Sequence, residues 1–356
     1  MGFIALLAFV ILLLHSPSIF RHAFYETFLT IHIILVTVML GTLWFHLKLS
    51  GQEWLPYLTA TIALWVFDRT VRFVRILYRN VSTRMARATV EALSDAVRVT
   101  IAMPRPWKFR PGQHAYIYMP AIGLWTSHPF TVAWSESKEV IRFDNKELSL
   151  YRQDICTKEK PTMSFIIRRR TGFTDSLYQR AMNSPDRLFS TMVFAEGPYG
   201  TYHSLDSYGT AILIAGGVGI THQVPHVQHL VKGYRDGTVA TRRITLVWII
   251  QSPEHLEWIK PWMTTILEME KRREVLKIML FVTKPKNVKE IHSPSSTVQM
   301  FPGKPNIGTL IDMEIENKAG AVGVSGKIYS LPITTKKKKT TFANVRVNSL
   351  WTWFIE

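Results

Sequence analysis

Apolar positions dominate the first 67 residues, which contain only four charged side chains: Arg21, Glu26, Lys48 and Glu53. A membrane-spanning helix needs about 20 apolar residues. Residues 28–47 meet that length, residues 54–67 form a shorter apolar segment, and residues 3–14 form a run too short to cross alone. No basic region precedes that first run, and no small-residue cleavage site follows it. This favours a truncated membrane helix over a signal peptide.

Basic residues flank the predicted spans unevenly. After the third segment come six arginines against the single acid Asp68: Arg69, Arg72, Arg75, Arg79, Arg84 and Arg87. Positive charge beside a span marks the cytoplasmic side. The third segment is therefore predicted to run inward and the second outward, with Arg21 and His22 in a further cytoplasmic loop.

His32 and His46 lie within the second segment, 14 residues apart. This spacing is close to four helical turns, so both imidazoles share one helix face, separated by about 21 Å. Such a pair could ligate two stacked haems, one axial position each. Histidines also tolerate membrane interfaces, and the spacing by itself favours that simpler interpretation.

Alternating strand patterns begin beyond residue 84 and predict a barrel-like β domain, with strands at residues 97–102 and 114–118. The segment His128-Pro129-Phe130-Thr131 follows. About 40 residues later, Arg168-Arg169-Arg170 precedes Gly172-Phe173-Thr174, which resembles a helix start with hydroxyl caps and free backbone N–H groups. Arginines beside a helix N-terminus suit a pyrophosphate. An exposed arginine cluster beside an ordinary cap is the alternative.

Strands and helices then alternate, which predicts a parallel α/β sheet. An apolar strand at residues 210–215 leads into Gly216-Gly217-Val218-Gly219-Ile220-Thr221 and a helix reaching residue 230. Glycines let backbone amides approach phosphates, so this turn is a candidate dinucleotide cradle, although it is not a strict G-x-G-x-x-G. A strand at 244–250, an amphipathic helix at 256–272 and a strand at 275–282 follow. Within that helix, core packing is predicted for Trp258, Trp262, Met263 and Met269.

The order of these motifs over residues 1–325, including Glu196-Gly197-Pro198-Tyr199-Gly200, resembles the fungal ferric reductase family. That family shares a transmembrane flavocytochrome superfamily with the NADPH oxidases. The resemblance implies a membrane α-helical segment followed by a ferredoxin-reductase-like module, made of an antiparallel β-barrel FAD domain and an α/β parallel-sheet NADPH domain. The expected boundaries are 1–80 for a partial transmembrane domain, 81–203 for FAD, 204–326 for NADPH and 327–356 for an atypical, disordered tail.

The resemblance also implies roles for individual residues. His32 and His46 are expected as axial ligands of haem b. In the flavin site Thr131 is expected beside the isoalloxazine as the catalytic residue, with Pro129, Phe130 and His128 around the flavin and its ribityl phosphate. The FAD pyrophosphate is expected at Arg168, Gly172, Phe173 and Thr174, and nicotinamide meets flavin at Gly197 and Pro198. The NADPH pyrophosphate is expected at Gly216, Gly217, Gly219, Ile220 and Thr221.

The implied function is transfer of electrons from cytosolic NADPH through FAD and haem b to ferric or cupric chelates across a membrane. A flavin is needed between NADPH and haem, because NADPH gives up two electrons as a hydride whereas a haem iron accepts one electron at a time. A multi-pass plasma-membrane protein with cytoplasmic FAD and NADPH domains is expected, with membrane lipid as its surroundings and no obligate protein partner. An O₂-reducing oxidase and a catalytically silent truncated paralogue are the alternatives.

Three features depart from the family pattern. The helix expected to carry the other two haem histidines would precede residue 1. The family's Cys-Gly-Pro-Gly turn is missing after the strand at 321–324, and the Lys336–Lys339 run there suggests a retained intron or faulty gene model. NADPH and NADH also remain open, because Gln251 follows the second nucleotide-domain strand, whereas Arg242 and Arg243 precede it.

Charge and cysteine content narrow the kinds of binding partner and metal site that the chain could have. The chain has a net charge of +17, which could indicate nucleic-acid binding. However, residues 68–110 contribute +7 and residues 327–356 contribute +5. The excess therefore marks a juxtamembrane arginine belt and the tail, and no nucleic-acid partner is expected. The single cysteine, Cys156, excludes an internal disulfide and a cysteine-based metal site within the chain.

Overall fold

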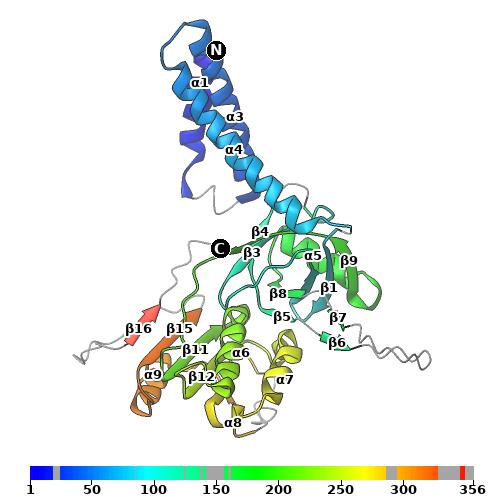
Figure 1. Cartoon of the computed structure of the whole chain (residues 1–356), viewed down its shortest axis with the longest axis vertical. Coiled ribbons are helices and arrows are strands. Elements are labelled where there is room, and N and C mark those ends of the chain that lie inside the picture. Colours follow the sequence, from blue (N-terminus) through cyan, green and yellow to red (C-terminus); the bar gives the residue numbers. More distant parts are fainter. Residues whose placement is uncertain are drawn as a thin grey trace. The chain divides into compact units, whose positions relative to one another are not determined.

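A computed structural model of the chain describes residues 1–18, 25–83, 85–123, 126–136, 139–141, 156–158, 162–285, 295–327 and 345–348. The chain divides into two compact units, of which the first comprises Met1–Tyr78 and the second begins at Arg79 (Figure 1). The lysine run at 336–339 and the residues Arg21, His22 and Arg84 lie outside the described residues.

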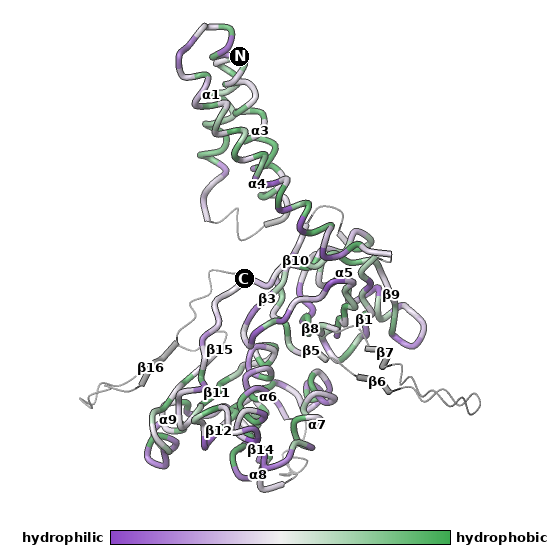
Figure 2. Tube along the Cα trace, viewed as in Figure 1, coloured by the Kyte–Doolittle hydropathy of each residue, from purple (hydrophilic) through white to green (hydrophobic). Residues whose placement is uncertain are grey.

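Helices α1 (Gly2–His15), α3 (Tyr25–Leu49) and α4 (Leu55–Asn80) form the first unit. Figure 2 shows how apolar α1 and α3 are. Within the described residues one helix is long and apolar enough to cross a membrane: Thr27–Leu49, with a mean hydropathy of 2.1. The apolar segment predicted at 54–67 lies in α4, which continues beyond it to Asn80. Arginine is a good helix former, so the arginine belt ended the apolar run without ending the helix.

Helices α1 and α3 pack against each other with their directions reversed. A Cβ placed on Gly2 would lie 3.2 Å from the His46 ring, and the His15 and Phe28 rings stack at 4.8 Å between centroids. The start of α1 therefore lies beside the end of α3. Glycine at position 2 leaves the room that the His46 imidazole occupies.

Antiparallel strands build the first part of the second unit, here called the antiparallel domain. One sheet has the order β5-β8-β2-β1-β9 and a second has the order β10-β3-β4. Their bounds are β1 Arg87–Leu93, β2 Ala96–Ala102, β3 His114–Tyr118, β4 His128–Thr131, β5 Trp134–Glu136, β8 Thr162–Arg168, β9 Leu188–Met192 and β10 Phe194–Tyr199. A two-stranded ribbon joins β6 (Glu139–Ile141) to β7 (Cys156–Lys158). Helix α5 (Phe173–Met182) packs on the first sheet, and η1 (Pro185–Arg187) precedes β9.

The second part, here called the parallel domain, has one parallel sheet with the order β14-β13-β12-β11-β15-β16. Its strands are β11 Thr210–Gly216, β12 Arg243–Ile250, β13 Leu276–Val282, β14 Val298–Pro302, β15 Val322–Lys327 and β16 Val345–Asn348. Helices α6 (Ile220–Asp236), α7 (Lys260–Glu268), α8 (Arg272–Val275) and α9 (Ile307–Glu316) connect them, together with η2 (Gly217–Gly219) and η3 (Pro253–Trp258). The expected antiparallel and parallel domains are both confirmed. In the tail predicted to be disordered, the described residues 345–348 form β16, and Lys327 is the last residue of β15.

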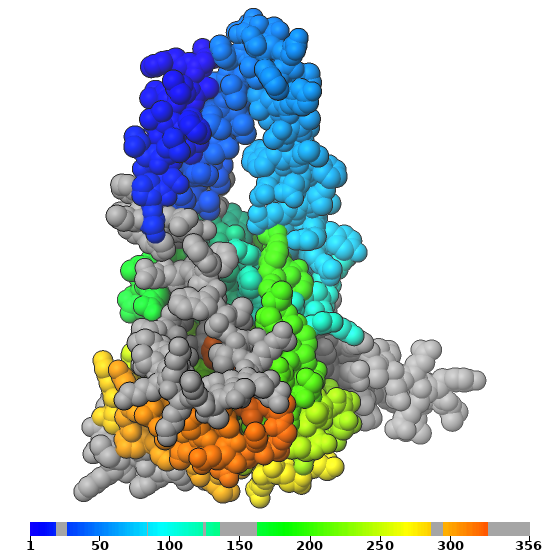
Figure 3. Space-filling model, turned by 90° about the vertical axis from the view of Figure 1, so that its left-hand side faces the viewer, coloured from blue at the N-terminus to red at the C-terminus, as the bar shows by residue number. Residues whose placement is uncertain are grey.

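Helices cover both faces of the parallel sheet. Successive residues of a strand point to opposite faces, so Leu213 of β11 belongs to the cluster beneath α6 and α7, whereas Ile214 belongs to the cluster beneath α9. Ile307 and Leu310 of α9 pack against this second cluster. Figure 3 shows the outer side of α9, in orange, at the surface of the parallel domain. The strands are therefore buried on both faces, which explains their nearly continuous apolar sequences.

The predicted helix at 256–272 is wrong as a single helix. It is divided into η3, α7 and α8. Pro261 stands in the first turn of α7, where its missing N–H costs nothing, and the same residue cannot lie within a continuous helix without loss of a hydrogen bond. The core prediction holds. Trp258 and Trp262 are buried, and Met263 and Met269 pack against the same cluster.

Both domains contribute to one hydrophobic cluster. Trp134 of β5 stacks on Trp262 of α7 with the ring planes 8° apart, and Trp258 Nε1 donates to the Ser94 carbonyl at 2.7 Å. Arg98 also donates to the carbonyl of Glu257. These contacts join the antiparallel and parallel domains directly, so the domain junction is packed like an interior.

Asn80, the last residue of α4, is fully buried. Its side-chain nitrogen donates to the Ala195 carbonyl and its oxygen accepts from the Ala195 N–H, each at 2.8 Å. The amide thus mimics a β-bridge to β10. Replacing it would leave both backbone groups of Ala195 buried without these partners.

We expect Asn80→Ala to destabilise the second unit by about 2 kcal/mol or more, since each unpaired buried polar group costs roughly 1–3 kcal/mol. Urea unfolding of the full chain in detergent, followed by tryptophan fluorescence, measures the loss. Asn183→Ala, at an exposed helix end, is the matched control and should change little. Equal effects of the two substitutions would contradict the buried-amide account.

Candidate nucleotide and flavin site

The glycine turn lies at the carboxyl end of β11, as predicted from the sequence. Gly217 has a φ of +50° with open space around its Cβ position, and Gly219 caps α6. The first turn of α6 carries no acidic residue, so no carboxylate there competes for the positive end of the helix dipole. Thr221 is buried and its hydroxyl donates to the Val218 carbonyl at 2.9 Å. The turn can therefore receive a pyrophosphate, with Thr221 shaping it from within.

Two side chains that the sequence did not single out for the site hold this turn in place. Trp248 of β12 donates from Nε1 to the Gly217 carbonyl at 2.9 Å. Gln223 is fully buried and its amide nitrogen lies 3.3 Å from both the Ile214 carbonyl and the Ser325 hydroxyl. They link the turn to the ends of β11, β12 and β15. Neither residue lies within a recognisable motif, so only the fold could reveal them.

The segment His128–Thr131 forms β4, and all four residues are half-buried. His114 of β3 pairs with Thr131, and the Phe173 ring stacks on the His128 ring at 4.6 Å. Phe130 also stacks on Phe173, at 6.4 Å. The predicted residues of β4 and of the α5 N-terminus are thus brought together on one side of the antiparallel domain.

The arginines before α5 have different partners. Arg168, expected at a pyrophosphate, donates to the Asp95 carboxylate at 3.3 Å. Arg169 pairs with Asp175 at 2.6 Å, and this hydrogen bond raises the pKa of Arg169. Arg170 is exposed, and no ion pair among the described residues includes it. Arg170 is therefore the arginine of this group best placed to meet a phosphate.

Gly172 precedes α5 with a φ of +66°, a backbone conformation that favours glycine. The expected hydroxyl cap is absent at this N-cap. Instead the Thr174 hydroxyl accepts from the Arg170 N–H at 3.0 Å, which closes the loop before the helix. Helix α5 therefore begins beside Arg170 without a side-chain cap.

Gly197 and Pro198 lie in β10, against β3. A Cβ on Gly197 would lie 3.3 Å from Trp107, from Ala115 and from the His114 carbonyl. The Trp107 Nε1 atom is buried and has no hydrogen-bond partner within the described structure. A buried indole N–H without a partner is costly, so it fits an acceptor supplied by a bound group. The residues of this domain therefore fit a flavin.

The two histidines of α3 lie in different surroundings. The Nδ1 atom of His32 is buried without a hydrogen-bond partner among the described atoms, and Phe28 stacks on its ring at 5.7 Å. His46 is exposed apart from its contact with Gly2. In the part of the chain that the structure describes, no group of three or more His, Cys, Asp or Glu side chains could hold a metal ion. The described residues thus place two imidazoles on α3, one partly buried and one exposed.

Family models match most of the second unit. A model described as an FAD-binding domain matches residues 80–203, and one described as the ferric reductase NAD binding domain matches residues 208–326. The chain belongs to the fungal ferric reductase family. The order of the two matches agrees with the structure, in which the antiparallel domain that contains His128 precedes the parallel domain that contains the glycine turn.

Two of the curated relatives of this chain are fungal proteins. The chain is 30% identical over 267 residues to the "Probable cell surface ferric reductase" of Aspergillus oryzae, covering 73% of this chain and 33% of that protein. It is 27% identical over 324 residues to the Ferric/cupric reductase transmembrane component 2 of Saccharomyces cerevisiae, covering 88% of this chain and 40% of that protein. The chain thus spans a third to two fifths of these relatives.

One solved structure with similarity is a ferredoxin reductase in carbazole 1,9a-dioxygenase. It is 14% identical, with a TM-score of 0.42, over 68% of this chain and 62% of that chain. A score this low adds no argument about function. The assignment of FAD-binding and NAD(P)H-binding domains to this family member rests on the family models.

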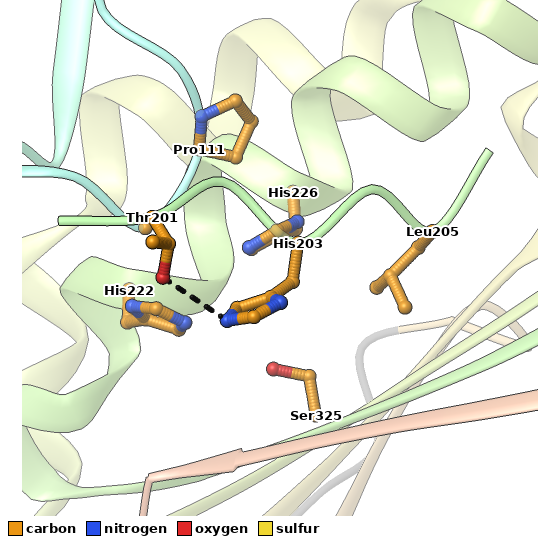
Figure 4. A pocket seen from close by; sticks show the side chains of 8 residues that line it. Pro111, Thr201, His203, Leu205, His222, His226 and Ser325 are labelled. Carbon is orange, nitrogen blue, oxygen red and sulfur yellow. Dashed lines mark hydrogen bonds between the residues drawn. The ribbon is translucent and has the colours of Figure 1, made fainter. Parts of the chain in front are cut away.

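Figure 4 shows a small pocket where the two domains of this ferric reductase family member meet. Its lining residues come from the antiparallel domain, the linker and the parallel domain: Pro111, Gly112, Thr201, His203, Leu205, His222, His226 and Ser325. His222 and His226 stand one helical turn apart on α6, with ring centroids 5.4 Å apart. Behind them His229 lies 2.8 Å from Asp206.

Gly112 makes the closest approach across this pocket. Its φ is +83°, and a Cβ there would lie 2.6 Å from Cε1 of the buried His222. Any side chain at position 112 would therefore push the turn of the antiparallel domain away from α6.

We expect Gly112→Ala to destabilise the second unit by about 2–3 kcal/mol, from the φ strain and the clash together. Gly237→Ala is the matched control, because Gly237 has a φ of +69° but open space around it. It should cost only about 1 kcal/mol. In a His222→Ala background the cost of Gly112→Ala should fall to the control level, as a double-mutant cycle by urea unfolding would measure. An unchanged cost in that background would contradict the clash.

Burial is the largest cause that lowers the pKa of His226 to about 3; the nearby His222, His229 and His203 also act to lower it, whereas Asp206 acts to raise it. In the unfolded chain the pKa of this histidine is near 6.5. Below pH 6.5 the unfolded state therefore binds a proton that the folded state rejects. Folded stability is lost as pH falls from about 6.5 toward 3, by up to about 1.4 kcal/mol per pH unit.

We expect His226→Gln to make the fall in unfolding free energy between about pH 6.5 and pH 4.5 less steep. His203→Gln, at an exposed position, removes only the smallest of these contributions to the pKa of His226 and should change the slope far less. Urea unfolding at several pH values measures both slopes. Parallel slopes for wild type and His226→Gln would rule out a neutral buried His226.

Proposed function

We propose that this chain transfers electrons from NADPH to a bound FAD, as the reducing part of a membrane metalloreductase. The observation that carries the proposal is the glycine turn of β11 in a chain whose antiparallel domain presents β4 and the α5 N-terminus together. The glycine turn can receive a nucleotide pyrophosphate, and the side of the antiparallel domain formed by β4 and the α5 N-terminus can receive a flavin. The names of the fungal relatives support ferric or cupric chelates as the final acceptor.

In this proposal the residues divide into three groups. Gly216, Gly217, Gly219, Ile220 and Thr221 shape the turn that binds the NADPH pyrophosphate. Phe173, stacked on His128, closes one side of the flavin site, where Pro129, Phe130 and Thr131 also lie. Gly172, Thr174 and Arg170 serve the FAD pyrophosphate, while Arg168 positions the loop through Asp95.

In this proposal nicotinamide and flavin meet at Gly197 and Pro198. Trp107 and the His114 carbonyl lie close to Gly197, so a side chain at this position would crowd the site. FAD supplies the step between a two-electron donor and one-electron acceptors. The residues around it bind and orient the two groups and exclude water. Thr131, half-buried beside His114, is proposed to position the isoalloxazine.

We propose haem b ligation by His32 and His46 as a further part of the same function. Their common face on α3 and the buried Nδ1 of His32 support it. The relatives' description as transmembrane components supports a membrane location, with the arginine belt on the cytoplasmic side. Because the described residues offer one imidazole per haem, they support the electron path only as far as the flavin.

The proposal is tested on the full chain, purified in detergent and supplied with FAD. We expect anaerobic NADPH to bleach the oxidised flavin and, with ferric chelate added, to produce Fe(II). We expect Gly217→Asp to raise the NADPH concentration needed by at least about tenfold, because a carboxylate at the turn repels the pyrophosphate. Gly217→Asn has the same size and also tolerates φ above zero, so its loss should be much smaller.

Failure to retain FAD, or an unbleached flavin with either nicotinamide nucleotide, would contradict the proposed function. Superoxide formation without iron, in place of Fe(II) formation with it, would favour an oxidase. A reduced-minus-oxidised spectrum that shows b-type haem, and loses it in His32→Ala, would support the haem ligands. Equal losses in the aspartate and asparagine variants of Gly217 would contradict the electrostatic part.

A further inference from the structure

The carboxyl ends of β12 and β13 lie side by side at the same edge of the sheet as the glycine turn. Gly216 pairs with Ile249, and Ile250 pairs with Val282. Beyond the strands, the Lys284 N–H donates to the Gln251 carbonyl at 3.0 Å. This hydrogen bond holds the residue after β13 next to the residue after β12. Lys284 and Gln251 are both exposed.

The described residues that follow β12 and β13 determine the charge that a ligand would meet at this edge of the sheet. Gln251 is neutral, and the first acid after β12 is Glu254, whose carboxylate accepts from the Ser94 hydroxyl at 3.2 Å. Ser252 accepts from the Glu254 N–H, which leaves its hydroxyl proton available to donate. No ion pair within the described residues involves Lys284. A hydroxyl donor and a cation outside the ion pairs of the described residues thus flank the end of β12.

Arg242, which precedes β12, and Arg243, its first residue, cannot contribute charge at this edge. Arg243 pairs in register with Thr210, at the opposite end of β11 from Gly216. Its guanidinium binds Glu314 at 2.8 Å, and the Arg242 guanidinium lies over the Tyr234 ring. The cations that the sequence placed nearest to this strand are therefore committed elsewhere.

We propose that Lys284, with the Ser252 hydroxyl, forms the subsite for the 2′-phosphate on the adenosine ribose, and so selects NADPH over NADH. Dinucleotides lie across the carboxyl edge of such sheets, with the ribose at the end of the strand beside the glycine turn. A carboxylate there suits the ribose hydroxyl of NADH, whereas a cation suits a 2′-phosphate. The neutral Gln251 and the exposed Lys284, which has no ion-pair partner in the part of the chain that the structure describes, match the second case. The inference rests on the proposed function of the glycine turn.

The test compares two probes that differ only in this phosphate, adenosine 2′,5′-bisphosphate and 5′-AMP. Binding of each to the full chain in detergent is measured by calorimetry. We expect Lys284→Gln to weaken the bisphosphate by at least about tenfold and 5′-AMP by less than twofold, since a hydrogen bond to a charged group contributes about 1.5–3 kcal/mol. Lys318→Gln removes an equal charge from an exposed residue before β15 and should change neither affinity.

The preference for NADPH over NADH in flavin bleaching, measured as the ratio of the two bleaching rates, gives a second readout. For Lys284→Gln this ratio should fall together with the affinity for the bisphosphate. If the bisphosphate and 5′-AMP bind to Lys284→Gln with the wild-type ratio, the inference is overturned while the proposed function stands. If wild type binds both probes equally, the inference is also overturned. If neither nucleotide reduces the flavin of wild type, the proposed function itself fails.

Discussion

The shared hydrophobic cluster between the antiparallel and parallel domains is the constraint on which the rest of the second unit depends. Trp134, Trp258 and Trp262 meet there, together with Ile166 and the buried residues of β11 and α6. Burying large aromatic side chains at a junction contributes several kcal/mol and leaves little freedom for rotation. The carboxyl end of β11 is therefore held in a defined position relative to β3 and β10. A nucleotide and a flavin bound to such a frame would be presented to each other without rebuilding the fold.

That frame explains why small residues stand where they do. Gly112 lets a turn of one domain approach His222 on a helix of the other, and Gly197 lets β10 lie against Trp107. Gly217 differs, because open space surrounds it. The first two glycines are required by protein packing, whereas the third leaves room for a ligand. Glycine in a motif thus has two distinct physical causes in this chain.

The positive side chains near the candidate sites also fall into two groups, those paired with a carboxylate and those that are not. Many of the positive side chains near the candidate sites are neutralised by partners: Arg168 by Asp95, Arg169 by Asp175 and Arg243 by Glu314. Arg170 and Lys284 are exposed and outside every ion pair of the described residues. Because phosphate binding needs a cation without a competing carboxylate, these two residues are better candidates than the arginines nearest in sequence. In the histidine pocket, burial keeps His226 uncharged at neutral pH.

The sequence by itself determined the class of fold, the place of the glycine turn, the apolar helices and the segment His128–Thr131. Each of these is local: a period of apolar residues, a run of glycines or a short motif in one stretch of chain. Only the tertiary structure decided that Asn80 binds Ala195, that Gly112 faces His222, and that Lys284 lies beside Gln251. It also decided that Arg168 is paired, and that one predicted helix divides at Pro261. These features depend on contacts between residues far apart in the chain, and local patterns carry no information on which distant partner a side chain will meet.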